Sequence, residues 1–446
     1  MSFLREALPW LLLLILVSRH IWKRYKKQFK AFVEEQKAKR SWSLNPKSPA
    51  DCPACGEGVK LRRINPPPAE LVPPWETVKG PGGPRKTIET EGYCCDDPEC
   101  RYYRNRDASV HALVGSGVRG TTDDIQRLLC QACGNRFSVR RDTALRDLKT
   151  EPERIELAMN LAAEGVCHAV IARALGHDEE TIARWLERSG RQASLLHDLY
   201  FHDLELAYVQ VDELQTKIRA YPGQKAWLWA AIDPQTKIVP TLTLSIGGRK
   251  TIHAMAFIHD LVLRLAVGCV PLFTSDGLRQ YFWAITAHFG RWILPPRKRV
   301  PRWIVEERLQ YGQLVKKRKG RKLQTVRTQI MCGTRPETVE TLEALGHSPT
   351  INTSFVERFN LTLRHLVAAL VRRTTALAQT EQTMMQRLEW SRAHYHFVRT
   401  HSSLRLGKDL PRSQRERTPA MAAGLTHRRW RTLDILRLPL IAQGGV

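Results

Sequence analysis

The sequence lacks an apolar run long enough to cross a membrane. Its only membrane-like stretch, Leu8 to Val17, has ten residues and is followed at once by basic residues, whereas a spanning helix needs roughly 20 apolar residues. The order is also wrong for a cleaved secretory signal, in which basic residues come first. We expect a buried or interfacial N-terminal helix, or an upstream extension outside the functional protein, and treat a membrane-tethered protein as a minor alternative.

Acidic residues are scarce relative to basic ones. The chain has 44 Asp+Glu against 70 Lys+Arg, which gives a formal net charge of +26. Such an excess repels itself unless a polyanion neutralises it, so nucleic acid is the expected partner and an anionic membrane surface is second. The hydrophobic content of 43% and charged content of 26% exclude collagen-like, mainly disordered and polytopic membrane classes.

Cysteine is also infrequent, but six of the ten cysteines come in tight pairs. Two Cys-x2-4-Cys pairs commonly hold a tetrahedral zinc ion, and this spacing indicates a metal in a reducing cytoplasm rather than disulfides. Cys52 and Cys55 form a third pair, which could complete an alternative site or hold a second metal. Free buried thiols are the other interpretation. The pairs that fit one zinc ribbon are Cys95 with Cys100 and Cys130 with Cys133.

Residues 152–191 have apolar residues at helical spacing, with breaks at Gly165 and Gly176. The pattern predicts three short helices, of which the last two span roughly 168–175 and 179–189 and are joined by a glycine-containing turn, as in a helix-turn-helix. Three packed helices without a DNA function are the alternative. The outward residues of the last helix, which would contact the major groove of DNA, are Thr181, Arg184, Arg188 and Arg191.

Beyond residue 205 the pattern becomes that of strands. Residues 207–212 alternate, residues 226–232 are continuously apolar and residues 239–246 alternate again. A helix at 252–266, a strand at 270–274 and a further helix follow. Three strands followed by alternating helix and strand predict a mixed α/β sheet with flanking helices.

Two acidic residues lie at the ends of predicted strands. Asp212 ends the first strand, and Asp276 follows the strand at 270–274, where Gly277 permits a sharp exit. If these strands are neighbours, the two carboxylates are adjacent, and both cannot ionise cheaply without a divalent cation. Oxygen ligands favour Mg²⁺ or Mn²⁺, which catalyse phosphoryl transfer in other enzymes.

A third acid, Glu357, lies in a predicted helix. Ser354 and Glu357 match a helix capping box, which would make Glu357 structural. However, Glu357, Asn360 and Arg364 share one helical face, whereas an apolar stripe occupies another. Docking of that stripe on the sheet would direct Glu357 towards the two aspartates.

Taken together, these residues resemble the catalytic region of bacterial insertion-sequence transposases of the DDE type. The cysteine pairs and the helix pair resemble the DNA-binding front end of the zinc-ribbon branch of that family. His396 stands where Asn is commoner in the family's terminal signature. The matching segments are Val211 to Leu214, the strand Trp227 to Asp233, Thr274 to Gly277, Val356 to Asn360 with Leu363-Arg364, and His394 to Leu404.

The resemblance implies an RNase H-like catalytic domain in which Asp212, Asp276 and Glu357 hold two Mg²⁺ or Mn²⁺ ions for cleavage and joining of DNA. It also implies that Asn360 and Arg364 contact the duplex, that the enzyme forms a homo-oligomer on DNA, and that it is cytoplasmic and nucleoid-associated. A catalytically inactive DNA-binding regulator derived from such an element is the alternative function.

The basic segment from Arg291 to Gln329 would contact phosphates as an insertion, or else it is a solvated charged loop.

We divide the chain into five predicted parts. The parts are a basic N-terminal helical segment (1–45), a cysteine-rich zinc-ribbon region (46–145), a helix-turn-helix domain (146–198), an RNase H-like domain (199–410) with the insertion 291–329, and a C-terminal tail (411–446).

Overall fold

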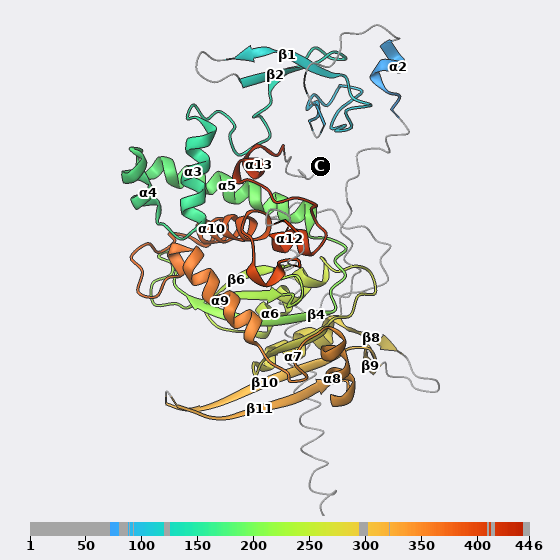
Figure 1. The fold of residues 1–446 in the computed structure, drawn as a ribbon, viewed down its shortest axis with the longest axis vertical. Helices are drawn as coiled ribbons and strands as arrows, with labels where there is room; N and C mark the ends of the chain where they lie inside the picture. The colour runs from blue at the N-terminus through green and yellow to red at the C-terminus, as the bar shows by residue number, and fades with distance from the viewer. Residues whose placement is uncertain are drawn as a thin grey trace, which may run out of the picture. The chain divides into compact units, whose positions relative to one another are not determined.

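The computed structural model describes residues 72–439, except 80–87, 89, 92, 120–124, 294–301, 321, 408–409 and 412–414. The predicted segment 1–45, with its apolar run, and the Cys52/Cys55 pair lie outside the described residues. The described chain forms two compact units (Figure 1). We call residues 201–361 the sheet unit, and residues 72–200 together with 362–439 the cysteine–helix unit. Within the described ranges, no helix combines the length and apolarity that a membrane crossing requires.

The sheet unit is built on a six-stranded sheet with the order β11-β10-β7-β4-β5-β6. β4, β5 and β6 are antiparallel, β4, β7 and β10 run parallel to one another, and β11 returns antiparallel to β10. This confirms the predicted mixed sheet. The strands are β4 (Tyr208–Thr216), β5 (Ala226–Ile232), β6 (Leu242–Ile246), β7 (Leu272–Asp276), β10 (Tyr311–Lys319) and β11 (Lys322–Cys332).

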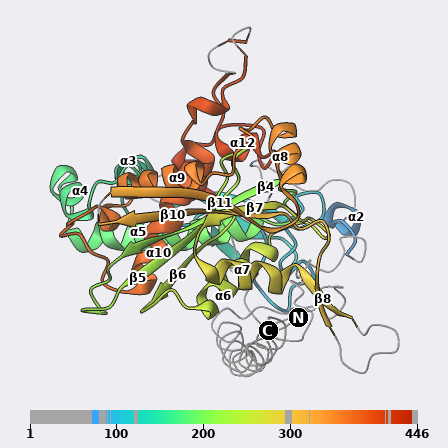
Figure 2. The same cartoon turned by 90° about the horizontal axis from the view of Figure 1, so that it is seen from below.

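Helices cover both faces of this sheet (Figure 2). On one face, Trp229 of β5 packs against Phe257 of α6 and Tyr281 of α7. On the other, Leu342 of α8 packs with Tyr208 of β4. Three of these flanking helices, α6, α7 and α9, were predicted, because their apolar residues recur at helical spacing; α8 was not predicted. Their bounds are α6 (Thr251–Val262), α7 (Arg279–His288), α8 (Arg335–Ala344) and α9 (Ser354–Leu366), of which α9 continues past the end of the sheet unit at Leu361.

The basic segment predicted as an insertion forms strands rather than a loop. It contains β9 (Arg302–Val305) and β10 in full, together with most of β8 (Gly290–Ile293) and of β11. Tyr311 and Leu314 at the start of β10 are buried, whereas the side chains of 322–327 in β11 are exposed. The sequence does not reveal these strands, because the outer ends of β10 and β11 are exposed to solvent on both faces. Alternation of apolar and polar residues is therefore not required there.

The cysteine–helix unit begins with a three-stranded antiparallel sheet of β1 (Leu113–Arg119), β2 (Ile125–Cys130) and β3 (Arg136–Ser138). Its small core combines buried cysteines with Tyr102, Leu128 and Phe137. The short helix α2 (Trp75–Lys79) sets Trp75 edge-on against Tyr102, with ring centroids 5.8 Å apart.

The rest of this unit is helical. α4 spans the predicted residues His168–Leu175, and α5 begins at the predicted Glu179 but continues to Tyr200. Gly190 lies inside α5, and a Cβ added there would lie 2.7 Å from the Cα of Gln386 in α10, so the two backbones touch. Buried side chains of α13 show that the C-terminal segment contributes to this core rather than forming a free tail. The other helices are α3 (Pro152–Ala163), α10 (Glu381–Ala393), α12 (Pro419–Ala422) and α13 (Thr432–Arg437).

Candidate metal centres

Asp212 and Asp276 lie side by side on neighbouring parallel strands. The register pairs Val211 with Ser275, so the next residue along each strand is one of the two aspartates. One carboxylate oxygen from each of Asp212, Asp276 and Glu213 lies within 4.8 Å of the others. The structure therefore brings the two predicted aspartates together. β4 continues to Thr216, so Asp212 lies within the strand rather than at its end as predicted.

Without a cation, ionisation of all the carboxyl groups in this cluster is unfavourable. Burial, followed by the charges of Glu213 and Asp276, raises the pKa of Asp212 to about 8. Burial also raises the pKa of Asp276, although the backbone N–H of Leu278 donates to its Oδ1 at 2.9 Å. Adjacent buried carboxylates therefore keep a proton near neutral pH unless a cation replaces it.

Glu213 is the third member of the cluster, and we had not predicted it. Its Oε1 is paired with Arg249, and its Oε2 accepts a 3.0 Å hydrogen bond from the Tyr281 hydroxyl. Alternation along β4 turns Glu213 towards α7, away from the face of Asp212. Burial, followed by the charge of Asp276, raises the pKa of Glu213 despite this ion pair. Because Glu213 is already paired with Arg249, the two aspartates are the members better placed to bind a cation.

Glu357 lies near the aspartates but outside this cluster. Its Oε1 accepts a 2.7 Å hydrogen bond from Thr353 Oγ1 and is also bound by Lys316 Nζ of β10. Its negative charge contributes to the raised pKa values of Asp212 and Asp276. α9 thus places a third carboxylate near the two aspartates. The role of Glu357 as a metal ligand stays a prediction.

The start of α9 is fixed to the sheet by Gln210, a residue that sequence analysis had not singled out. Its Oε1 accepts hydrogen bonds from the backbone N–H groups of Phe355 and Val356 at 3.0 and 3.1 Å. Asn352 Oδ1 accepts from the backbone N–H of Ser354 at 3.2 Å. These contacts satisfy N–H groups that a helix start leaves without intrahelical partners, and they hold α9 over the face of β4 that carries Asp212.

Asn360 connects α9 directly to the carboxylate cluster. Its Nδ2 donates to Asp212 Oδ2 at 2.8 Å. Its Oδ1 is buried and has no hydrogen-bond partner among the described residues. A buried acceptor without a partner next to two carboxylates fits a hydrated divalent cation, which would supply both a charge and water donors. The predicted contact of Asn360 with DNA stays a prediction.

The four predicted zinc ligands lie together in the cysteine–helix unit. The sulfur atoms of Cys95, Cys100, Cys130 and Cys133 all lie within 4.8 Å of one another. The Cys95–Cys133 and Cys100–Cys130 sulfur pairs are 3.5 and 3.7 Å apart. A tetrahedron with Zn–S bonds of about 2.3 Å has sulfur–sulfur edges of about 3.8 Å. The geometry therefore suits a single metal ion.

Burial makes the three buried cysteines of this cluster poor thiolates in the absence of a metal. It raises the pKa of Cys95 and of Cys130 to about 12 and that of Cys100 to about 11. Gly134 turns the chain with a φ of 80°, and its backbone N–H donates to the Cys130 carbonyl at 2.8 Å. A metal ion would reverse the thiol pKa shifts by binding the deprotonated sulfurs.

The predicted DNA-contacting residues of α5 differ in their surroundings. Arg184 and Arg191 are exposed, and Arg191 pairs with Glu187 at 3.0 Å. Arg188 is half-buried and donates to the carbonyl of Arg146, while Thr181 accepts from Arg184 at 3.3 Å. Contact of these residues with DNA stays a prediction.

Arg364 follows the boundary between the units and belongs to the cysteine–helix unit. Its Nη1 donates to the carbonyl of Leu370 at 3.3 Å. Burial, followed by the nearby charge of Arg372, lowers the pKa of its guanidinium. Its predicted contact with DNA also stays a prediction.

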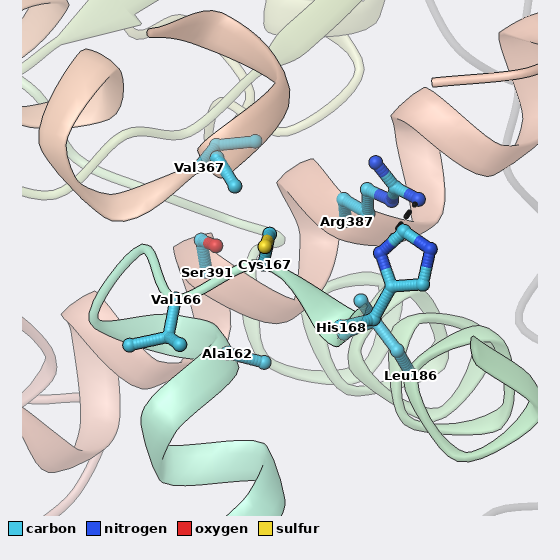
Figure 3. Close-up of a pocket in the computed structure, with 9 residues that line it drawn as sticks. Ala162, Val166, Cys167, His168, Leu186, Val367, Arg387 and Ser391 are labelled. Atoms are coloured by element: carbon cyan, nitrogen blue, oxygen red, sulfur yellow. Dashed lines mark hydrogen bonds between the residues drawn. The ribbon is translucent and has the colours of Figure 1, made fainter. Parts of the chain in front are cut away.

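A small cavity in the cysteine–helix unit is the pocket drawn in Figure 3. Its volume of about 20 Å³ is enough for roughly one water molecule. Arg387 points along its wall towards His168 Nδ1, 3.5 Å away, and also donates to the Ala376 carbonyl at 3.2 Å. The cavity is too small for a nucleotide or another substrate.

Comparisons with known proteins do not identify the chain. No protein-family model, curated protein or solved structure matches it. A functional conclusion therefore depends on the geometry of the two candidate metal centres.

Proposed function

We propose that this chain is a DDE-type DNA transposase that cleaves the ends of a mobile element and joins them to target DNA, using Mg²⁺ or Mn²⁺. The observation that carries the proposal is the placement of Asp212 and Asp276 at adjacent positions of two parallel strands. The sheet supports it as well, because an antiparallel β6-β5-β4 meander joined to parallel β7 and β10 is the arrangement expected of an RNase H-like fold.

The residues around the carboxylates have separate tasks in this proposal. Asp212 and Asp276 hold the cations, and Asn360 orients Asp212 through its 2.8 Å hydrogen bond. Divalent cations bound there would stabilise the attacking and leaving oxygens of phosphoryl transfer. Glu357 is the third predicted ligand. It pairs with Lys316, whose ammonium group would lie where a DNA phosphate approaches.

The cysteine–helix unit would bind the terminal inverted repeats. Four cysteines at tetrahedral spacing support a structural Zn²⁺. The tight turn between α4 and α5, with Gly176 in the left-handed conformation, supports a helix-turn-helix that presents Arg184 to duplex DNA. The net charge of +26 supports binding to a polyanion. A homo-oligomer on DNA and a nucleoid-associated location follow from the same proposal.

The decisive experiment is a strand-cleavage and joining assay with Mg²⁺ or Mn²⁺, on duplex oligonucleotides that carry the DNA flanking the coding region. Asp276→Asn should reduce the rate by about 10³-fold, since metal-assisted charge stabilisation is worth several kcal/mol. Glu340→Gln, an exposed change on α8, is the matched control and should leave the rate unchanged. Undiminished joining by Asp276→Asn would remove that residue from the active site.

A DNA-binding regulator without catalysis is the second candidate. The observation that favours it is that Lys316 and Arg249 already pair with Glu357 and Glu213, which leaves two carboxylates rather than four for cations. Such a regulator would bind duplex DNA in EDTA, would bind equally well as the Asp212→Asn variant, and would never nick it. The same assay therefore separates the two functions.

A further inference from the structure

The hairpin formed by β10 and β11 extends beyond the sheet to which it belongs (Figure 1). β10 pairs with β7 only from Tyr311 to Leu314 in the part of the chain that the structure describes. From Val315 onwards, β10 pairs with β11. Residues 315–320 and 322–327, here called the basic ribbon, thus form a two-stranded arm.

The basic ribbon carries six Lys or Arg and no acidic residue: Lys316, Lys317, Arg318, Lys319, Lys322 and Arg327. Lys319 lies directly opposite Lys322 in the hairpin register. Like charges opposite each other destabilise a hairpin, and an isolated two-stranded hairpin is marginal even without them. A polyanion bound to the ribbon would relieve this repulsion.

From these observations we propose that the basic ribbon is a docking surface for duplex DNA. A two-stranded β-ribbon fits the major groove of B-form DNA, whereas the major groove of duplex RNA is too deep and narrow for it. Lysines also protect exposed sheet edges from aggregation. Protection alone does not account for Leu323 and Val326, which are 50% and 49% exposed on the same arm and which could contact sugars or thymine methyl groups.

The position of the ribbon relates it to the candidate active site. Lys316, at the base of the arm, binds Glu357, so DNA lying on the ribbon would enter beside the carboxylate cluster. The inference rests on the proposed function for the use made of the bound DNA, but the binding itself is measurable without catalysis.

The test is fluorescence anisotropy of the full chain with a labelled duplex of arbitrary sequence, in EDTA, over a series of salt concentrations. The variant Lys317→Gln/Lys319→Gln/Lys322→Gln should raise Kd at least about tenfold and should reduce the slope of log K against log salt by about three, close to one per lost phosphate contact. The matched control Lys217→Gln/Arg219→Gln/Lys225→Gln removes the same charge from exposed positions of the sheet unit. It should change neither value.

Thermal unfolding of each variant checks that it remains folded, and Lys319→Gln alone, with an expected slope change of about one, replaces the triple variant if that one unfolds. If wild type binds DNA and the ribbon variant binds with the same Kd and slope, the docking surface is wrong while the transposase proposal stands. If wild type binds no duplex, both are wrong. Equal affinity of the wild type for duplex RNA would overturn the assignment to DNA.

Discussion

The two candidate metal centres obtain their ligands in different ways. The cysteine–helix unit takes four sulfurs from two short turns, and each turn supplies a pair whose spacing is set by the local chain. The sheet unit takes carboxylates from separate strands, and their meeting depends on the register between β4 and β7. One centre is therefore local and the other is a product of the whole fold. We expect the first to fail when one ligand is lost, and the second to lose its cations while the sheet remains folded.

The largest expected effect on stability is at the four-cysteine site of the cysteine–helix unit. Cys130→Ser should abolish zinc binding and unfold the region of β1, β2 and β3, because structural zinc contributes about 10–16 kcal/mol to comparable small domains. Zinc content measured by atomic absorption, with limited proteolysis of the same sample, provides the check.

Cys94→Ser is the matched control for this change. Cys94 is buried beside Cys95 but lies outside the four-sulfur cluster, so this variant should keep its zinc and its protease resistance. Equal zinc content in the Cys130→Ser protein would show that the four sulfurs do not form the site.

At the carboxylate cluster, loss of a ligand should stabilise the protein rather than unfold it. In the metal-free protein, folding must protonate Asp212 at neutral pH because its pKa is about 8. Asp212→Asn removes that cost and can keep the contact with Asn360, so the metal-free protein should gain about 2 kcal/mol or more of unfolding free energy. The same change should weaken Mn²⁺ binding by about 10²-fold. Urea unfolding in EDTA and a Mn²⁺ titration followed by electron paramagnetic resonance measure the two effects.

Glu213→Gln separates Glu213 from Asp212. It leaves Arg249 without its carboxylate partner, but it also removes a carboxyl whose pKa is raised by burial and by the charge of Asp276. The two effects oppose each other, so the unfolding free energy should change by less than about 1 kcal/mol, and Mn²⁺ binding should be affected less than in Asp212→Asn. A larger loss of Mn²⁺ affinity in Glu213→Gln would make Glu213 the principal ligand.

The last expected effect is the response of the cysteine–helix unit to acid. Burial, followed by nearby arginines, lowers the pKa of His394 to about 4. Between pH 6.5 and 4 the unfolded chain therefore binds one more proton than the folded chain at this residue, and stability falls as the pH falls. The loss from His394 should be about 2 kcal/mol between pH 7 and 5.

Urea unfolding at both pH values, followed for wild type and His394→Gln, tests this. The variant should lose less stability than wild type over the same interval. An identical pH dependence of the two proteins would show that His394 does not titrate as described.

Much of the candidate site was predictable, and the rest depended on long-range contacts. Alternation along β4 and the strand ending at Asp276 predicted aspartates that would be adjacent if the two strands were neighbours. The pairing of β4 with β7 itself came from the structure. Pairing of Glu213 with Arg249, and of Glu357 with Lys316, requires side chains from segments that no local pattern connects. The four cysteines were predicted as a set because their spacing is itself the ligand geometry.

The fold divides in the same way. The start of α5 was predictable from the turn at Gly176, but its end was not. Glycine is common at helix ends, whereas Gly190 lies inside α5. The glycine is kept within the helix by the neighbouring α10, a contact that is invisible in the local sequence. The basic ribbon escaped prediction for a related reason, since its solvent-exposed strands have no buried face to impose alternation.

Gly190 also determines which substitutions the helical core can accept. The space that a side chain would need is already filled by the main chain of Gln386, which cannot rotate away. By contrast, a Cβ at Gly176 would meet no atom within 4 Å, and its φ of 66° is one that asparagine tolerates. A library of random variants selected for folded protein should thus recover asparagine at position 176 and only glycine at position 190.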